Sequence, residues 1–291
     1  MAITTKVRKQ VIIMNTDIKL VALDLDRTTL NSESHLSEVN RKALIDAISN
    51  GVHVCIASGR AFDTLPEDVI SVPGIEYAIT SNGAAIYRIT GKECLKSYLL
   101  TPSSVKTILN LTANDTVTYE AFIKGQAFAS TEYTAHPEKY GATEHSLAYV
   151  KKTRILKDDI KGFILEHCHE LDSMDIVVGD EELKKDIMNR IRKATDEVYM
   201  TSSISQLLEI SYKDAGKKSG VKFLTEYLGL SRENVAAFGD ADNDTDMIEY
   251  AGTGIAMENA APHLKQIADH ITLHHDKDGV AYAFRNILNI C

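Results

Sequence analysis

The first part of the chain alternates short apolar runs with an amphipathic segment. Apolar runs that predict strands occur at 20–23, at 52–58 and, after the Pro73-Gly74 turn, within 77–87. Between the first two runs, Ser37 is a good helix N-cap, and the apolar positions from Val39 to Ile48 fall on one helical stripe. Gly51 stands where the C-terminal cap of that helix is expected. The pattern predicts a strand–helix–strand unit with neighbouring parallel strands.

The C-terminal third continues this alternation. It predicts a helix at 219–230, a strand that begins at 234 and ends in acids, a helix at 245–252, a strand at 253–260, and a strand fragment leading into a terminal helix within 270–288. Alternating strands and helices are typical of a parallel sheet that helices cover on both faces.

The middle of the chain has a different pattern. Strand-like runs at 116–123, 126–130, 173–179 and 206–211 mix with charged helical runs at 157–171 and 182–194. We therefore expect an α+β domain inserted into an α/β core. The expected limits are 1–18 for an N-terminal extension, 19–87 and 206–291 for the core, and 88–205 for the inserted domain.

Composition and charge narrow the functional classes. The chain has 291 residues, 44% hydrophobic and 25% charged, as in an ordinary globular protein. Its 32 basic and 41 acidic residues give a net charge of −9, which argues against a nucleic-acid or membrane-surface binder. A local positive site for a small anionic substrate remains compatible with this charge.

We expect a cytoplasmic protein. The apolar run Val11–Met14 is too short for a signal peptide, and no run approaches the roughly 18 apolar residues of a membrane span. Four cysteines lie far apart without CxxC spacing, which favours free thiols in a reducing compartment. The oligomeric state is left open.

Polar residues follow the predicted strands at their carboxyl ends. Asp24 and Asp26 follow the first strand, and Ser58 ends the second. Asp240, Asn243 and Asp244 follow the strand that begins at 234. Lys217 and Lys218 stand at the start of the helix that leads into that strand. Aspartates are also common in solvated turns, which is the simpler explanation of the first pair. However, ligands of parallel α/β sheets bind at this edge, so we expect these side chains to converge.

Such a set suits phosphoryl chemistry. Carboxylates from two strands provide the oxygen ligands that Mg²⁺ prefers, and lysine and serine can hold a phosphoryl group. One aspartate can then attack phosphorus as a nucleophile. The second, two residues on, can protonate the leaving oxygen and later activate water.

The motifs together resemble the haloacid dehalogenase superfamily, and within it the Cof-type sugar phosphatases with a large α+β cap of the C2 type. The matching segments are DLDRTTLNS, ASGR, TSNGA, AGKKSGVKFL, FGDADNDTDMI and DKDGVA, in the family's order and across nearly the whole core. The resemblance implies a Rossmann-like three-layer α/β/α core with a mostly parallel sheet, and the inserted domain as its cap.

The resemblance also implies a role for each matching residue. Asp24 would be the nucleophile and Asp26 the general acid/base, and both would contact Mg²⁺. Ser58 and Lys217 would bind the phosphoryl group and take part in catalysis. Asp240, Asn243 and Asp244 would complete the metal site directly or through water, and Asn82 and Gly83 would border the substrate.

The chain departs from the family pattern at three places. Arg27 replaces the usual glycine after the second aspartate, where a long cation could narrow the mouth or contact substrate. Ser58 replaces threonine and keeps the hydroxyl. The usual Lys-Gly is Lys217-Lys218, and counting back from Leu224 selects Lys217.

Other motifs favour simpler explanations. The acids from Asp240 lack the glycine and glutamate of a calcium-binding loop. The groups His167–Glu170 and His274–Asp276 have no second half with zinc spacing, so a polar helix face and a surface loop explain them better. Arg60 is expected to anchor the loop after Ser58.

The function expected is a Mg²⁺-dependent phosphatase acting on a small phosphorylated metabolite, with a sugar phosphate as the expected class, through an aspartyl-phosphate on Asp24. A phosphomutase or phosphotransferase of the same fold and a catalytically silent sugar-phosphate sensor are the alternatives. A signalling receiver would lack Asp26 and the inserted domain. Candidates for specificity in the cap are Glu120, Lys124 and Glu209, which are polar residues in or beside strand-like runs.

Overall fold

The computed structural model describes residues 17–291, apart from the side chains of 144–146. The expected N-terminal extension therefore lies outside the described residues, except for residues 17 and 18.

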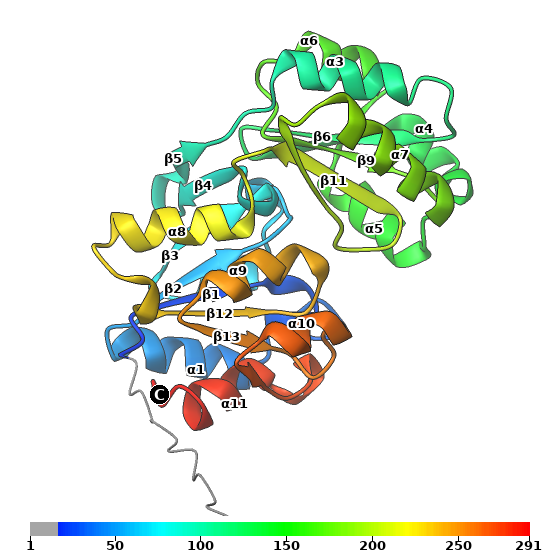
Figure 1. Ribbon diagram of the computed structural model, residues 1–291. Helices are drawn as coiled ribbons and strands as arrows, with labels where there is room; N and C mark the ends of the chain where they lie inside the picture. The colour runs from blue at the N-terminus through cyan, green and yellow to red at the C-terminus, as the bar shows by residue number, and fades with distance from the viewer. Residues whose placement is uncertain (1–16) are drawn as a thin grey trace, which may run out of the picture.

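Eight strands form the core sheet, in the order β14-β13-β12-β1-β2-β3-β4-β5 (Figure 1). They are β1 (Leu20–Leu23), β2 (His53–Ala57), β3 (Ile75–Thr80), β4 (Ala85–Arg88), β5 (Glu93–Ser97), β12 (Val235–Gly239), β13 (Thr253–Ala256) and β14 (His270–Ile271). The strands from β14 to β3 are parallel, and β4 and β5 add an antiparallel edge. The buried central strands β1 and β12 are continuous apolar runs, as expected for a sheet covered on both faces.

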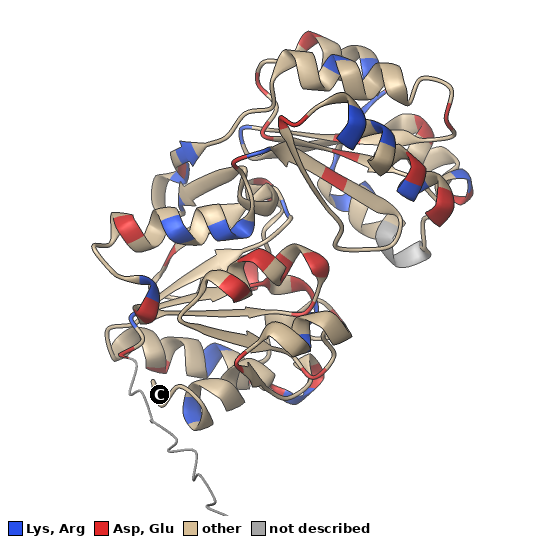
Figure 2. Ribbon diagram, in the orientation of Figure 1, with Lys and Arg blue, Asp and Glu red and all other residues tan. Residues whose placement is uncertain are grey.

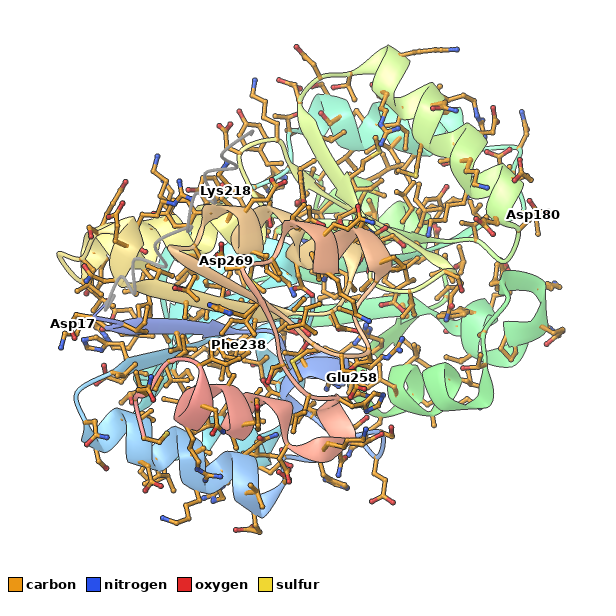
Figure 3. The ribbon with its side chains drawn as sticks, turned by 60° about the horizontal axis from the view of Figure 1, so that its bottom comes forward. Asp17, Asp180, Lys218, Phe238, Glu258 and Asp269 are labelled. Carbon is orange, nitrogen blue, oxygen red and sulfur yellow. The ribbon has the colours of Figure 1, made fainter. Side chains whose placement is uncertain are left out.

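Helices cover both faces of the core sheet, which confirms the predicted α/β/α layers (Figure 1). Helices α1 (Glu38–Ser49) and α11 (Gly279–Asn286) lie together on one face, and α8 (Lys217–Tyr227) and α9 (Thr245–Tyr250) on the other. Phe238 of β12 packs under α11, with its ring 5.7 Å from that of Phe284 (Figure 3). The shorter helices are α2 (Glu67–Ile70) and α10 (Pro262–Ile267).

The cap contains a second sheet of six strands in the order β10-β11-β9-β6-β7-β8. Its strands are β6 (Thr118–Ile123), β7 (Gln126–Ser130), β8 (Ile155–Lys157), β9 (Ser173–Val177), β10 (Val198–Thr201) and β11 (Leu207–Tyr212). Its helices are α3 (Pro102–Leu111), α4 (Thr131–Ala135), α5 (Glu144–Thr153), α6 (Ile160–Glu166) and α7 (Glu181–Ala194). Apolar residues at alternate strand positions, such as Tyr119 and Ile176, pack with Ile108, Ile164 and Ile187 from α3, α6 and α7.

The predicted single strand at 77–87 is wrong. Residues 75–88 form a hairpin, in which β3 and β4 pair antiparallel across the turn Ser81–Gly83. All three turn residues have positive φ, +48°, +51° and +88°, a conformation that Asn-Gly adopts at low cost. The continuous apolar pattern on both sides concealed this turn.

The chain also passes from the core sheet to the cap sheet, and back again, at residues other than the expected limits of 88 and 205. Strand β5 still pairs with β4 in the core sheet, and β11 pairs with β9 and β10 in the cap sheet. The crossings lie at 98–101 and 213–216. Strand β5 is largely exposed and lacks an apolar run, so the hydrophobic pattern did not predict it as a strand of the core.

Among residues 17–291, no helix is both long and apolar enough to cross a membrane.

Candidate active site

Three aspartates meet at the carboxyl ends of neighbouring strands. Asp24 follows β1, and Asp240 and Asp244 follow β12, which pairs parallel with β1. One carboxylate oxygen from each lies within 4.8 Å of those of the other two, and all three residues are 6% exposed or less. The convergence expected from the strand ends is therefore present for these three residues.

Lys217 lies at the centre of this cluster. It is fully buried at the start of α8, and its Nζ donates to Asp24 Oδ1 at 2.7 Å and to Asp244 Oδ1 at 2.5 Å. Burial opposes its charge, but the two carboxylates outweigh burial and raise the pKa of Lys217. Lys218, by contrast, lies exposed at the surface (Figure 3). Of the two lysines, only Lys217 reaches the aspartates.

The cluster has more negative charge than one lysine can balance. Burial, followed by the charge of Asp244, raises the pKa of Asp24, although Lys217 opposes this. The same two causes raise the pKa of Asp240 to about 7. Buried carboxylates in excess of their cations are stabilised by a bound metal ion, so the donor set fits Mg²⁺.

Both carboxylate oxygens of Asp244 accept hydrogen bonds from other groups of the protein. Its Oδ2 accepts from the backbone N–H groups of Asp240 and Ala241, at 2.9 and 3.0 Å, while its Oδ1 is bound by Lys217. Asp240 has weaker partners, with Thr28 Oγ1 and Asn259 Nδ2 each 3.3 Å from one of its oxygens. The carboxylates with capacity left for a cation are therefore those of Asp24 and Asp240.

Asp26 points away from the cluster and is paired with Arg60. The guanidinium donates to both oxygens, from Nε at 2.8 Å and from Nη2 at 2.6 Å. Arg60 also donates to the carbonyl of Thr64 at 3.3 Å, as a loop anchor would. The pairing with Asp26 was missed, because the motif placed Arg60 after β2 but contained no sign of its partner.

Arg27 occupies a backbone position that normally requires glycine. Its φ of +61° lies in the left-handed region, which explains why glycine is usual after the second aspartate in the family pattern. Its side chain is 67% exposed, with Nε 3.8 Å from Asp240 Oδ2. The expected long cation is therefore close to Asp240, one of the three clustered aspartates.

Ser58, Asn82 and Gly83 lie where the core meets the cap. Ser58 is buried at the end of β2, and its Oγ accepts from the Arg60 N–H at 3.2 Å. Asn82 accepts from Asn243 Nδ2 at 2.9 Å and donates to Glu209 Oε1 of the cap at 3.1 Å. A side chain on Gly83 would overlap the carbonyl of Gly216, so this glycine lets the β3–β4 turn approach the start of α8.

The candidates for specificity and the histidine group lie in different parts of the structure. Glu120 and Glu209 are buried on the cap sheet, whereas Lys124 is exposed and pairs with Glu170 at 3.3 Å. In the group His274–Asp276, Asp276 accepts from the backbone and hydroxyl of Ser32 at 2.8 and 2.6 Å. This group connects two loops, and one donor atom from each of its three residues lies within 4.8 Å of those of the other two, so its interpretation as a surface loop stays a prediction.

A three-layer α/β/α core whose first strand ends in this aspartate pair, with a lysine and further acids behind it and an α+β insertion, defines a hydrolase of the haloacid dehalogenase class. The family model described as haloacid dehalogenase-like hydrolase matches residues 21–284, so the chain belongs to this family. The resemblance inferred from the motifs is confirmed.

The relatives support an enzyme of the phosphatase class. The chain is 31% identical over 270 residues to 5-amino-6-(5-phospho-D-ribitylamino)uracil phosphatase YcsE of Bacillus subtilis, covering 93% of this chain and 96% of the relative. It is 30% identical over 290 residues to phosphatase YwpJ of the same organism, covering 93% and 100%. A solved haloacid dehalogenase-like hydrolase from B. subtilis superposes with a TM-score of 0.78 at 27% identity, covering 93% of this chain and all of that one.

Proposed function

We propose that the protein is a Mg²⁺-dependent phosphomonoesterase that acts on a small phosphorylated metabolite, a sugar or polyol phosphate, through an aspartyl-phosphate on Asp24. The observation that supports this most strongly is the buried Lys217, which joins Asp24 to Asp244 at the ends of β1 and β12. Lys217 favours the charged form of Asp24, against the burial that raises its pKa, and orients the carboxylate as a nucleophile.

The first chemical step uses Asp24 and Asp26. Asp24 Oδ1 is held by Lys217, while Oδ2 has no hydrogen-bond donor among the described residues and is free to attack phosphorus. As the new O–P bond forms, the bond to the ester oxygen breaks, and Asp26 transfers a proton to the leaving alkoxide. Asp26 has to turn one oxygen away from Arg60 to do this, and its half-exposed carboxylate has room to move.

The second step reverses the proton transfer. Asp26, now a carboxylate, takes a proton from a water molecule that attacks the phosphorus of the aspartyl-phosphate. The O–P bond to Asp24 breaks, and inorganic phosphate leaves. Ser58 and Lys217 bind phosphoryl oxygens during both steps. Mg²⁺, held by Asp24, Asp240 and the Asp26 carbonyl with Asn243 nearby, would neutralise charge on those oxygens.

The substrate class follows from the cap and from the relatives. A cap sheet that contacts the core beside the site suits a small ester that can be enclosed. Three relatives are named as phosphatases of 5-amino-6-(5-phospho-D-ribitylamino)uracil, a phosphate ester on a ribityl chain, which is an open-chain polyol. A phosphorylated ribitylamino-pyrimidine therefore belongs in the substrate panel beside sugar phosphates.

The decisive experiment measures phosphate release by the purified protein from an aryl phosphate and from this panel, with and without Mg²⁺. We expect Mg²⁺-dependent release that Asp24→Asn abolishes and that the exposed control Asp196→Asn retains. Release without an added acceptor separates a phosphatase from a phosphomutase. No release from any ester, or equal release by Asp24→Asn, would contradict the proposal.

A further inference from the structure

Three acidic side chains lie in a row across the cap sheet. Glu120 on β6 is directly opposite Asp175 on β9, and Asp175 is directly opposite Glu209 on β11, so all three share one face. Figure 2 shows red bands on these cap strands, whereas the central core strands are free of them. We call Glu120, Asp175 and Glu209 the acid row.

The acid row faces the core. Glu209 contacts Asn82 of the β3–β4 turn, and its Oε1 also lies next to Gly59 at the end of β2. The alternate residues of the same strands point to the opposite face, where they pack against the cap helices. The Glu209 end of the acid row is therefore directed at the part of the core that holds the proposed phosphate site, whereas the Glu120 end contacts Arg154 of the cap.

Only two of the three carboxylates in the acid row have hydrogen-bond donors among the described residues. Arg154 pairs with Glu120, with Nε and Nη2 each within 2.8 Å of Oε2. Glu209 accepts from Asn82 and from the N–H and hydroxyl of Ser203. Asp175 is 5% exposed and has no hydrogen-bond partner among the described residues. A buried carboxylate without a donor is unusual and indicates that something else supplies one.

Electrostatics lead to the same conclusion. Burial, and then the charges of Glu209 and Glu120, raise the pKa of Asp175, while Arg154 opposes them. Three carboxylates thus share one guanidinium. A neutral group that donates hydrogen bonds would satisfy Asp175, whereas a second anion would increase the repulsion.

Asp175 lines a narrow pocket between the sheets, which in this structure has no room for a water molecule. The core contributes Gly59, Ser81 and Asn82, and the cap contributes Ser173, Thr201, Ser211, Ile210, Asp175 and Glu209. The pocket adjoins the phosphate site, because Asn82 also bonds Asn243 behind Asp240. An ester whose phosphate sits at Asp24 would direct its alcohol part into this pocket once the sheets separate enough to admit it.

We propose that the acid row is the subsite for the alcohol part of the substrate, that Asp175 accepts hydrogen bonds from its hydroxyls, and that the row rejects esters with a second anionic group. This inference rests on the proposed function and specifies the substrate as the phosphomonoester of a neutral, hydroxyl-rich alcohol. Rejection arises because a second phosphate or carboxylate would enter a buried acidic environment in which Arg154 is already paired with Glu120.

The test compares two open-chain esters that differ at one terminal carbon. Sorbitol 6-phosphate ends in a hydroxymethyl group, and 6-phosphogluconate ends in a carboxylate. Each is measured as a competitive inhibitor of aryl phosphate hydrolysis, so that neither has to be a good substrate. We expect the inhibition constant of 6-phosphogluconate to be at least about 10-fold higher than that of sorbitol 6-phosphate.

The variants Asp175→Asn and Glu209→Gln show whether the row causes this selectivity. Each replaces a buried carboxyl group by a neutral amide and is expected to narrow the ratio of the two inhibition constants severalfold. A general structural defect would weaken both inhibitors alike and leave the ratio unchanged. The control Glu182→Gln, on the exposed face of α7, should keep the wild-type ratio. If Asp175→Asn does not fold, Glu209→Gln alone decides.

The outcomes separate this inference from the proposed function. Absence of aryl phosphate hydrolysis would overturn the proposed function, and the inference with it. Hydrolysis with equal inhibition by the two esters, or with a ratio that neither variant changes, would overturn the acid-row subsite and leave the phosphatase intact.

Discussion

Arg60 holds both carboxylate oxygens of Asp26, and the ring of Tyr149 lies 4.8 Å from the same guanidinium. Tyr149 belongs to α5 of the cap, and on its other side the guanidinium of Arg154 lies 4.9 Å from its ring. The proposed general acid is therefore positioned by a core arginine that the cap contacts directly. Movement of the cap would therefore change the position of the Asp26 carboxylate through the contacts of Tyr149 and Arg60.

The first prediction concerns this arginine. Arg60→Ala is expected to lower kcat roughly 10- to 100-fold with a smaller change in KM, because Asp26 loses its orientation while the phosphate site is intact. The kcat of Arg60→Lys should lie between those of the wild type and Arg60→Ala, since lysine keeps the charge but cannot form the bidentate pair with Asp26. Steady-state kinetics on the best substrate measures both variants. Arg88→Ala, which breaks the ion pair with Glu93 at the sheet edge, is the control. A wild-type kcat for Arg60→Ala would refute the positioning role.

The second prediction concerns Lys217 as the counter-ion of two buried aspartates. Lys217→Met is expected to lower the free energy of unfolding by about 3 kcal/mol in EDTA, because Asp24 and Asp244 lose their shared cation. Adding Asp24→Asn removes one unpaired charge and should recover on the order of 1 kcal/mol. Urea denaturation of the wild type, both single variants and the double variant gives the coupling energy. Strictly additive effects would show that the two side chains act independently.

The third prediction separates metal binding from activity. Mg²⁺ is expected to raise Tm, since binding to the folded state alone stabilises by roughly 2.7 kcal/mol at one hundred times the dissociation constant. Asp240→Asn should abolish this rise and should be more stable than the wild type in EDTA, because it relieves repulsion from Asp244. Thermal unfolding across a Mg²⁺ titration tests both effects. An undiminished Mg²⁺ response in the variant would remove Asp240 from the metal site.

The sequence predicted those parts of the site that depend on strand ends. Asp24 and Asp240 could be placed together because the carboxyl ends of adjacent parallel strands meet at one edge. Lys217 was selected by counting back from Leu224 in the family pattern. Asn82-Gly83 also contained a local turn signal for the hairpin, although the apolar pattern favoured one strand.

The remaining features depend on pairing between distant elements. Asp175 lies within an apolar run, and period-two alternation can place it on one face of a strand without showing that this face meets the core. Arg60 and Asp26 are on different loops, and their pairing requires both backbones in place. No local pattern specifies such contacts, so the acid row and the Arg60 pair emerged only from the structure.

The fourth prediction concerns Arg27, whose charge lies beside the proposed metal site. Arg27→Gly is expected to lower the Mg²⁺ concentration for half-maximal stabilisation about two- to fivefold, because it removes a cation 3.8 Å from Asp240. The effect should shrink at high salt, since the arginine is largely exposed. Arg27→Lys keeps the charge and serves as the control. A Mg²⁺ midpoint equal to that of the wild type at low salt would show that Arg27 has no influence on the metal.

The fifth prediction concerns the pH dependence of stability at the junction of the two sheets. Asp172 is 3% exposed, and its Oδ1 accepts from Ser97 Oγ of β5 at 3.1 Å, while its Oδ2 has no partner among the described residues. Burial raises its pKa from the ordinary 3.8 to about 6, although Ser97 opposes this. The folded protein therefore binds a proton between pH 4 and 6 that the unfolded chain releases. The stability from this group is fully present below pH 4 and is lost as the pH rises through 6.

A shift of this size corresponds to roughly 3 kcal/mol. Asp172→Asn keeps an acceptor for Ser97 but has no charge to bury, so its advantage in stability over the wild type should grow from about 1 kcal/mol at pH 4.5 to about 3 kcal/mol at pH 7.5. Urea denaturation in EDTA across this range measures the difference between the two proteins, in which the other buried carboxylates cancel. The exposed control Asp196→Asn should follow the wild type at every pH. If the Asp172→Asn curve instead runs parallel to that of the wild type from pH 4.5 to 7.5, Asp172 does not titrate in this window, and the junction gains no stability from its proton.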